Sequence, residues 1–228
     1  MVGFALARPG HIDAVVVCPT RRRKGLGRAL VQNMEYGRLG GGPAHFVPGV
    51  PEGWDEAEAF CRAVGLEADW WAEDLHMVLG RRDPNFTSCT SADRDAVVSM
   101  VYEEFSKRWT DDTRARFEHG DHQDVVIIRD NAGPVAFCQT WHHKSNLLGP
   151  STFWLRNSCT KYGGIGPVGV RERARGQGLG GRIVVEALNY LAHRGVREVV
   201  VDWTAIGDFY KKYGFVSWQR YRGYSKNG

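Results

Sequence analysis

The chain has 228 residues, of which 43% are hydrophobic and 25% charged, and its formal net charge is +4 at pH 7. This length accommodates one large domain or two modest ones, and the composition excludes fibrous, disordered and miniprotein architectures. The mild positive charge points neither to nucleic acid nor to a membrane as partner. The sequence lacks the ~18-residue apolar run of a spanning helix and the pattern of a secretory leader, so we expect a cytoplasmic protein.

The cysteines are odd in number and far apart, at Cys18, Cys61, Cys89, Cys138 and Cys159. This spacing predicts neither a disulfide framework nor a metal knuckle, and we expect most of the thiols to be buried. None of them stands in the context of a nucleophile.

In chain order, residues 3–7 and 12–17 read as strands. The second strand runs into a loop with Arg22, Gly25 and Gly27, and helical spacing follows at Leu30, Val31 and Met34. After a linker at residues 84–91, a helix is predicted with one apolar face formed by Ala96, Val97, Met100, Val101 and Phe105. A hairpin follows at 124–129 and 135–141, then a strand at 164–170, a second glycine loop, a helix and a later strand.

The two glycine loops are copies of one pattern. Val170, Arg175, Gly178, Leu179 and Gly180 each stand 153 residues after Val17, Arg22, Gly25, Leu26 and Gly27. A second echo relates Phe60 and Gly65 to Phe209 and Gly214 at an offset of 149. Self-similarity of this kind predicts two related units, which we place at residues 1–82 and 83–228. The first lacks a helix and a strand pair, so its sheet edge is expected to be covered by the second unit or by another chain.

The second loop has the properties of an anion site. The first turn of a helix leaves N–H groups without internal partners, and glycines let a phosphate approach them closely. Arg175, with Arg171, Arg173 and Arg182 nearby, is expected to add positive charge for phosphate groups.

Two other nucleotide-site patterns compete with this interpretation. Gly176, Gly178 and Gly181 satisfy the dinucleotide fingerprint, and Glu198 stands roughly where a ribose-binding acid would. However, five residues separate Val170 from Gly176, whereas in a Rossmann unit the strand runs almost directly into the first glycine. A P-loop kinase is excluded because the sequence has no GxxxxGK[ST] segment.

The pattern Val-x-x-x-x-Arg-x-x-Gly-x-Gly at Val170, with Phe-Tyr-x-x-x-Gly-Phe beginning at Phe209, resembles the GNAT superfamily of acetyl-CoA-dependent N-acetyltransferases, tandem-domain members included. The resemblance covers residues 84–228 and, as a later half of the same fold, about residues 1–80. It implies an α/β fold with a mixed, mostly antiparallel sheet flanked by helices, in two units of which the first is truncated. It also implies that acetyl-CoA, without a metal, is held by Val168, Gly169, Val170, Arg175, Gly176, Gln177, Gly178, Leu179, Gly180 and Gly181.

The resemblance also assigns catalytic roles. Tyr210 occupies the family's usual general-acid position, and a phenol of pKa ~10 stays protonated at neutral pH. A strand N–H near Val168 would polarise the thioester carbonyl. The usual Glu base is absent from residues 164–170, and Asp202, His142 and His143 are the candidates for deprotonating the amine. Trp203 stands where the family often has Asn, and Cys61 stands at the tyrosine position of the first unit, which we therefore expect to be non-catalytic.

Two groups of residues have an open role. Of Glu103 and Glu104, one is expected in solvent, and the other is a candidate for substrate contact. Trp109, Trp141 and Trp154 either line an acceptor pocket or fill the core, and we favour the core for at least two.

The resulting hypothesis is transfer of an acetyl group from acetyl-CoA to a primary amine of a small molecule, by direct attack and without an acyl-enzyme. An amino sugar, a polyamine and an aminoglycoside-like amine all stay open as acceptors, as does a homodimer. The alternative is a catalytically inactive CoA-binding or regulatory protein.

Overall fold

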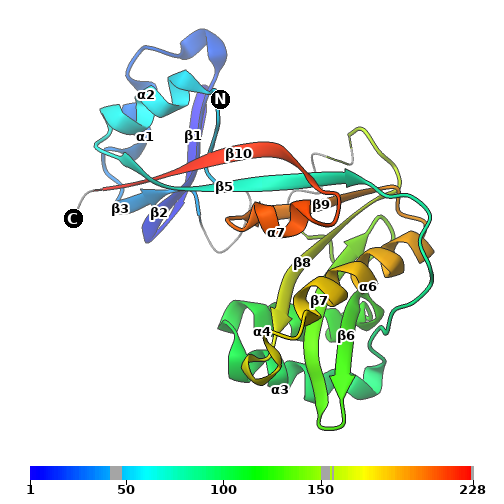
Figure 1. Cartoon of the computed structure of the whole chain (residues 1–228). Coiled ribbons are helices and arrows are strands. Elements are labelled where there is room, and N and C mark those ends of the chain that lie inside the picture. Colours follow the sequence, from blue (N-terminus) through cyan, green and yellow to red (C-terminus); the bar gives the residue numbers. More distant parts are fainter. Residues whose placement is uncertain (42–47, 150–154, 156, 227–228) are drawn as a thin grey trace. The chain divides into compact units, whose positions relative to one another are not determined.

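The computed structural model describes residues 1–41, 48–149, 155 and 157–226, and the chain divides into two compact units (Figure 1). Unit 1 comprises Met1–Asp74, Trp203–Gly207 and Ser217–Gly228, and unit 2 comprises Leu75–Asp202 and Asp208–Val216. These bounds differ from a division at residue 82, because the last strand of the chain pairs with strands of unit 1. The division into a partial unit at 1–82 and a complete unit at 83–228 stays a prediction.

Unit 2 is a sheet with helices on both faces. Its strands stand in the order β6-β7-β8-β9, followed by the end of β5 (Glu67–Val78). Strand β7 is antiparallel to both of its neighbours, β6 and β8, and β9 is parallel to β8. Its elements are α3 (Arg94–Glu104), α4 (Lys107–Glu118), β6 (Val125–Asp130), β7 (Gly133–His142), β8 (Tyr162–Val170), α6 (Leu179–His193), β9 (Glu198–Thr204) and α7 (Gly207–Lys211).

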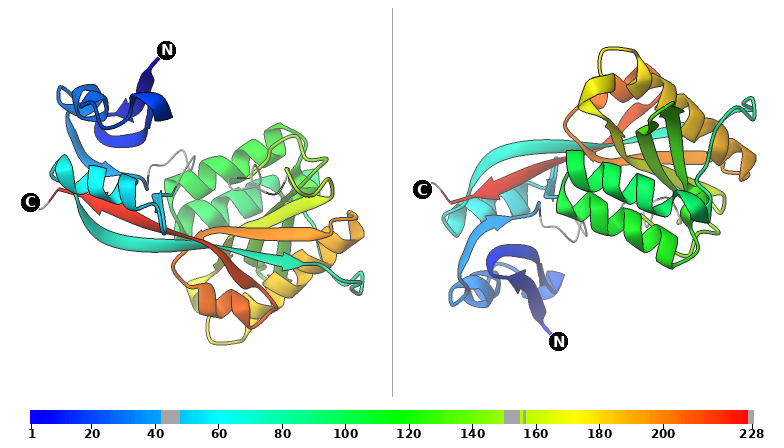
Figure 2. Two further views of the ribbon diagram at one scale, coloured as in Figure 1. Left: turned by 90° about the horizontal axis from the view of Figure 1, so that it is seen from above. Right: turned by 90° about the horizontal axis from the view of Figure 1, so that it is seen from below.

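Strand alternation separates the two faces of this sheet. Val126 and Ile128 pack with the apolar residues of α6, whereas Val125 and Ile127 pack with those of α3. Both faces are therefore buried, and strand β6 reads as a continuous apolar run rather than an alternating one. Figures 1 and 2 show α3 and α4 on one face of the strands and α6 on the other.

Strand β8 is irregular near its middle. Val168 pairs with Cys138 and Ile165 with Thr140, so two β8 residues, Gly166 and Pro167, oppose one on β7, and Gly166 has φ of 135°. Such a bulge bends the strand. The parallel register with β9 covers Tyr162–Gly164, before the bulge. The end of β8 that leads into the glycine loop is thereby directed away from β9.

Unit 1 has a simpler sheet with the strand order β1-β2-β3-β10, followed by β5, and β4 pairs with β10. Its elements are β1 (Gly3–Arg8), β2 (Gly10–Val17), α1 (Leu26–Val31), β3 (Tyr36–Leu39), β4 (Val50–Pro51), α2 (Asp55–Ala63), β5 (Glu67–Val78) and β10 (Val216–Ser225). Strand β1 lies at the end of the order, and Phe4 and Leu6 on it are exposed. The predicted fold class, a mixed, mostly antiparallel sheet flanked by helices, is confirmed.

Candidate functional site

The second glycine loop connects β8 to α6 through a 3₁₀ turn at Glu172–Ala174. Gly176 and Gly178 have φ of 77° and 74°, the left-handed region that L side chains rarely adopt. A Cβ built on either glycine would meet nothing within 4 Å. The backbone surface at these two residues is therefore open to a ligand.

The amides of this loop precede the hydrogen bonds of α6. The helical bonds begin with Gly181 and Arg182, which both donate to the Gly178 carbonyl at 3.1 Å. No side chain caps the helix, and its first turn holds no acid. In the part of the chain that the structure describes, the amides from Gly176 to Gly180 find no protein acceptor, so they are available to an anion.

Acidic residues anchor the loop from outside. Arg171 binds Glu103 at 3.0 Å and Glu104 at 3.2 Å, and the amide of Glu172 donates to Glu104 at 2.7 Å. Arg173 similarly binds Asp130 at 2.5 Å. Glu103 and Glu104 thus hold the loop. Glu103 is exposed, as expected for one of the two acids, and a substrate contact of the other stays a prediction. Since the bound carboxylates neutralise Arg171 and Arg173, these arginines position the loop rather than supply charge for a ligand.

Two arginines remain at the loop. Arg182 pairs with Glu186 at 2.9 Å, although its side chain is largely exposed. Arg175 donates from Nε to the Val170 carbonyl at 3.3 Å, which closes the loop over the end of β8. Of the predicted phosphate cations, Arg175 is the one without a carboxylate partner among the described residues.

The first loop repeats this backbone at the predicted offset. Arg22 donates from Nε to the Val17 carbonyl at 3.3 Å, and Gly25 begins α1 with φ of 78°. Arg23, however, stands at the position of Gly176 and takes φ of 60°. A non-glycine residue there is strained, and α1 covers six residues against fifteen in α6. The two loops share the arginine hydrogen bond and the left-handed glycine at the helix start. They differ at Arg23 and in the length of the helix that follows.

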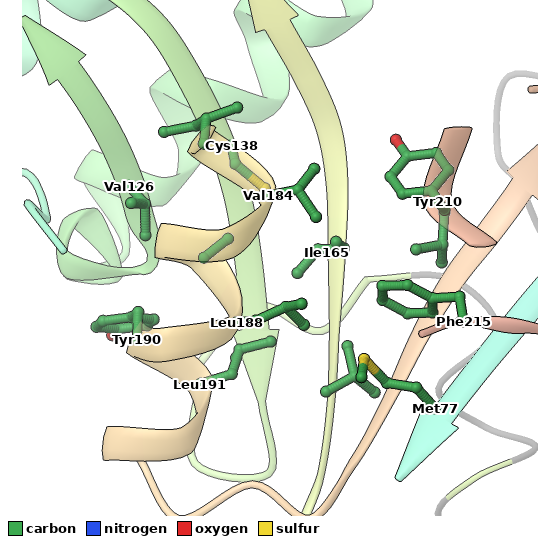
Figure 3. Packing of buried hydrophobic residues seen from close by; sticks show 14 of the residues in the cluster. Met77, Val126, Cys138, Ile165, Val184, Leu188, Tyr190, Leu191, Tyr210 and Phe215 are labelled. Atoms are coloured by element: carbon green, nitrogen blue, oxygen red, sulfur yellow. The ribbon is translucent and has the colours of Figure 1, made fainter. Parts of the chain in front are cut away.

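Tyr210 lies on α7 with 6% of its surface exposed. Its ring makes edge contacts with Phe209 and Phe215 at centroid distances of 5.0 and 6.0 Å. Figure 3 shows its hydroxyl directed away from Phe215. Burial, with smaller contributions from Cys138 and Asp202, raises the pKa of Tyr210 well above the ordinary phenol value.

Asp202 lies near the end of β9 and is half-buried. One of its carboxylate oxygens is 3.9 Å from the position that a Cβ of Gly166 would occupy. The predicted acid and base are therefore both beside the bulge of β8, and the charge of Asp202 reaches Tyr210. The structure brings these two residues together without assigning either a role.

His142 belongs to a buried network instead. Its Nε2 lies 3.2 Å from Asp124, its Nδ1 accepts the amide of Lys144 at 3.1 Å, and its side chain is 1% exposed. It is four residues beyond Cys138 along β7, about 13 Å at strand rise. Asp124 also accepts hydrogen bonds from Tyr190 at 2.6 Å and Ser145 at 2.5 Å. His142 therefore joins the strand, α6 and the following turn, and His143 next to it packs on the ring of Tyr162.

Two of the three candidate tryptophans, Trp109 and Trp141, pack in or against the core. Trp141 is buried, and Trp109 stacks on Phe105 beside Phe137, so both contribute to packing. Trp154 lies outside the described residues. Trp203, in unit 1, has φ of 41°, donates its amide to buried Asp74 at 2.7 Å and stacks on Trp70. Sequence reasoning noted its unusual type but not its strained backbone, which no residue pattern signals.

The described residues contain no group of three or more His, Cys, Asp or Glu side chains arranged to hold a metal ion. Among the helices of the described ranges, none has the length and apolarity needed to cross a membrane.

A similar solved structure is a GCN5-related glucosamine N-acetyltransferase region in a fungal multi-domain GH3 β-N-acetylglucosaminidase, with a TM-score of 0.82, 25% identity and 97% coverage of this chain. The chain spans 30% of the length of that protein. A GCN5-related N-acetyltransferase from Sphaerobacter thermophilus has a TM-score of 0.68 and 20% identity, covering 98% of this chain and 75% of that one. A tandem GNAT protein from the clavulanic acid biosynthesis pathway has a TM-score of 0.57 and 19% identity, covering 98% and 78%.

A search of curated proteins found no match. The family model of the acetyltransferase (GNAT) family matches residues 94–215. This range covers more than half of the chain and contains the glycine loop, Asp202 and Tyr210. The chain therefore belongs to the acetyltransferase (GNAT) family.

Proposed function

We propose that the chain transfers the acetyl group of acetyl-CoA to a primary amine of a small molecule, with unit 2 as the active unit. The observation that carries this proposal is the juxtaposition of two features on β8. At one end of the strand lies a helix start with open, unbonded amides, and beside its bulge lie Tyr210 and Asp202.

The residues of the loop fit a diphosphate. Its oxygens would accept hydrogen bonds from the amides of Gly176 to Gly180, and its negative charge would lie at the positive end of the α6 dipole. Arg175 would add a cation on an exposed side chain. On one edge, strand β8 pairs with β7 through Val168, Gly169 and Val170. On the other edge, the pairing of β8 with β9 covers Tyr162–Gly164, before the bulge, and does not extend to these three residues. That edge can pair with an extended amide-containing chain such as a pantetheine arm.

When bound, acetyl-CoA supplies an activated acetyl thioester. In the proposed reaction the N–H of Val168 would polarise the thioester carbonyl, and Tyr210 would donate a proton to the departing thiolate. Burial keeps Tyr210 protonated over the whole physiological range. Asp202 is the candidate that accepts the proton of the attacking amine, directly or through water. His142 is withdrawn as a candidate because Asp124 and the Lys144 amide occupy its ring nitrogens.

The acceptor that we favour is an amino sugar. The support is the similarity to the fungal region described as a glucosamine N-acetyltransferase, which covers 97% of this chain. Polyamines and aminoglycoside-like amines are the competitors. Unit 1 would be non-catalytic, since Cys61 is buried at the position of Tyr210, and the first loop holds a strained arginine in place of Gly176.

The test is thiol release from acetyl-CoA with a panel of glucosamine, spermidine and an aminoglycoside. We expect release with glucosamine that falls strongly in Tyr210→Phe and is retained in the matched Tyr102→Phe variant, whose ring is exposed on α3. Thiol release with another amine and none with glucosamine would refute the amino-sugar acceptor but would still support acetyl transfer to an amine. Tight CoA binding without release from any amine would support the inactive CoA-binding alternative.

A further inference from the structure

A cavity of about 400 Å³ lies in unit 2 at the C-terminal end of α6. Three segments line it: residues 79–84 after β5, Lys161 before β8, and the turn from α6 into β9. With fifteen residues at a helical rise of ~1.5 Å, α6 separates this cavity from the glycine loop by about 21 Å. The cavity is therefore distinct from the proposed cofactor site.

Four cationic side chains line the cavity: Arg81, Arg82, Lys161 and Arg197. In the described part of the chain, none of the four takes part in an ion pair. The nearest acid in sequence to Arg197 is Glu198, whose carboxylate binds His76 at 2.9 Å. Burial lowers the pKa of Arg82, so its charge is partly desolvated without a compensating carboxylate.

Hydrogen bonds fix the three segments against one another. The amide of Arg197 donates to the Lys161 carbonyl, and that of Leu79 donates to the Arg197 carbonyl, both at 2.7 Å. Asn189 on α6 donates from Nδ2 to the carbonyl of Asn85 at 2.9 Å. The backbone of Lys161 and Arg197 is therefore held directly, and the segment that carries Arg81 and Arg82 is tethered at Leu79 and Asn85.

A simpler reading is that basic residues gather there to offset the negative end of the α6 dipole. That reading applies to His193 and Arg197. Arg81 and Arg82 come from a different segment and bring two further positive charges to the same cavity. Three of the last four carbonyls of α6 are already satisfied, because the amides of Arg194, Gly195 and Val196 donate to Tyr190, Ala192 and Leu191 at 3.0 Å. Four like charges around one cavity repel one another, and a bound anion would relieve that repulsion.

We propose that this cavity binds a small anion with two or more negative charges, of the phosphate or diphosphate class. Guanidinium groups match phosphate oxygens in a bidentate geometry, and three of the four cations are arginines. The cavity volume is within the range of small-molecule sites. An anion held there, remote from Tyr210, would be an effector or an anchoring group rather than the acetyl acceptor.

The experiment is calorimetric titration of inorganic diphosphate into the Gly178→Glu protein, whose glycine loop is blocked, at constant ionic strength. We expect one binding event. Adding Arg82→Gln and Arg197→Gln should weaken it at least tenfold. Adding Lys107→Gln and Arg114→Gln removes the same number of positive charges from the exposed surface of α4, where both side chains pair with Asp111, and should leave the affinity unchanged.

Absence of heat with Gly178→Glu, or equal weakening by the two charge-matched pairs, would overturn the proposal. Circular dichroism checks the fold, and Lys161→Gln replaces the double variant if that one does not fold. No CoA enters this titration. A wild-type protein that fails to bind CoA would therefore refute the proposed function and leave this result intact.

Discussion

Tyr210 is the residue on which the proposed chemistry depends most. Its ring is buried beside Phe209 and Phe215, so its position is set by packing rather than by a flexible side chain. Asp202 is close enough for its charge to contribute to the raised pKa of the phenol. A protonated phenol beside a carboxylate is a suitable pair for moving two protons in opposite directions.

Replacing Tyr210 with Phe removes the donor while keeping the ring that packs. We expect kcat to fall by about 10²- to 10⁴-fold, the contribution typical of a positioned general acid. The affinity for CoA should change by less than about threefold, since the loop amides are untouched. Steady-state kinetics and calorimetry on the two proteins test this, and an unchanged kcat would remove Tyr210 from the mechanism.

The pH profile gives a second residue-level prediction. Because burial raises the pKa of Tyr210 above its ordinary ~10, the donor form persists as the pH rises. We expect kcat to increase as the amine loses its proton and then to stay level up to about pH 10. A descending limb near pH 8 that disappears in Tyr210→Phe would show that the phenol ionises earlier than its burial predicts.

Strand and helix elements show what could be predicted from the sequence and what could not. The hairpin of β6 and β7, helix α3 and both glycine loops lie where their patterns place them, because each has a strong local signal. Helix α4 and strand β10 were not predicted. Helix α4 is rich in charged residues, and β10 alternates tyrosines with arginines beside a glycine. Their stability comes from partners distant in the sequence, such as β3 for β10.

The candidate site could likewise be predicted only in part, because only some of its residues lie in local sequence motifs. The loop residues and Tyr210 belong to contiguous motifs, so they could be named. The anchoring of Arg171 by Glu103 and Glu104 joins residues 67 and 68 positions apart, and the network around Asp124 joins α6, β7 and a turn. Neither arrangement follows a local spacing, so the sequence alone does not show which partners His142 and Glu104 bind.

The link between α3 and the loop gives a prediction of its own. Glu104→Gln weakens the bonds to Arg171 and to the Glu172 amide, so the loop should be less well ordered when empty. We expect KM for acetyl-CoA to rise about fivefold with kcat nearly unchanged, equivalent to roughly 1 kcal/mol of lost hydrogen bonding. Glu118→Gln, at the exposed end of α4, is the matched control. A fall in kcat without a change in KM would contradict a positioning role.

The buried network predicts a dependence of stability on acid. Burial alone would raise the pKa of Asp124, but hydrogen bonds from His142, Ser145 and Tyr190 outweigh it and hold the pKa below its usual value. The carboxylate therefore stabilises the fold above its unfolded pKa of ~3.9, and this contribution is lost as the pH falls below that value. Asp124→Asn should lower the free energy of unfolding at pH 7 by about 2 kcal/mol. Denaturant melts at pH 7 and pH 3 test this, and the difference between variant and parent should shrink at pH 3.

At the scale of the whole molecule, the chain contains two glycine loops of similar backbone conformation that are followed by different elements. The second loop begins a fifteen-residue helix and is followed by Tyr210, whereas the first begins a six-residue helix and is followed by Cys61. The first loop also lacks the glycine at Arg23. We infer that the repeated pattern records a common origin, while binding of CoA belongs to the second copy.

Calorimetric titration of CoA into the wild-type, Gly178→Glu and Gly25→Glu proteins tests this account most directly. A glutamate side chain at Gly178 would occupy open space over the loop amides, and its carboxylate would repel a diphosphate. The Gly25→Glu variant makes the same substitution in the first loop. The account predicts one molecule of CoA per chain for the wild type, no detectable binding for Gly178→Glu and unchanged binding for Gly25→Glu. No heat from the folded wild-type protein, or equal loss in both variants, would contradict it.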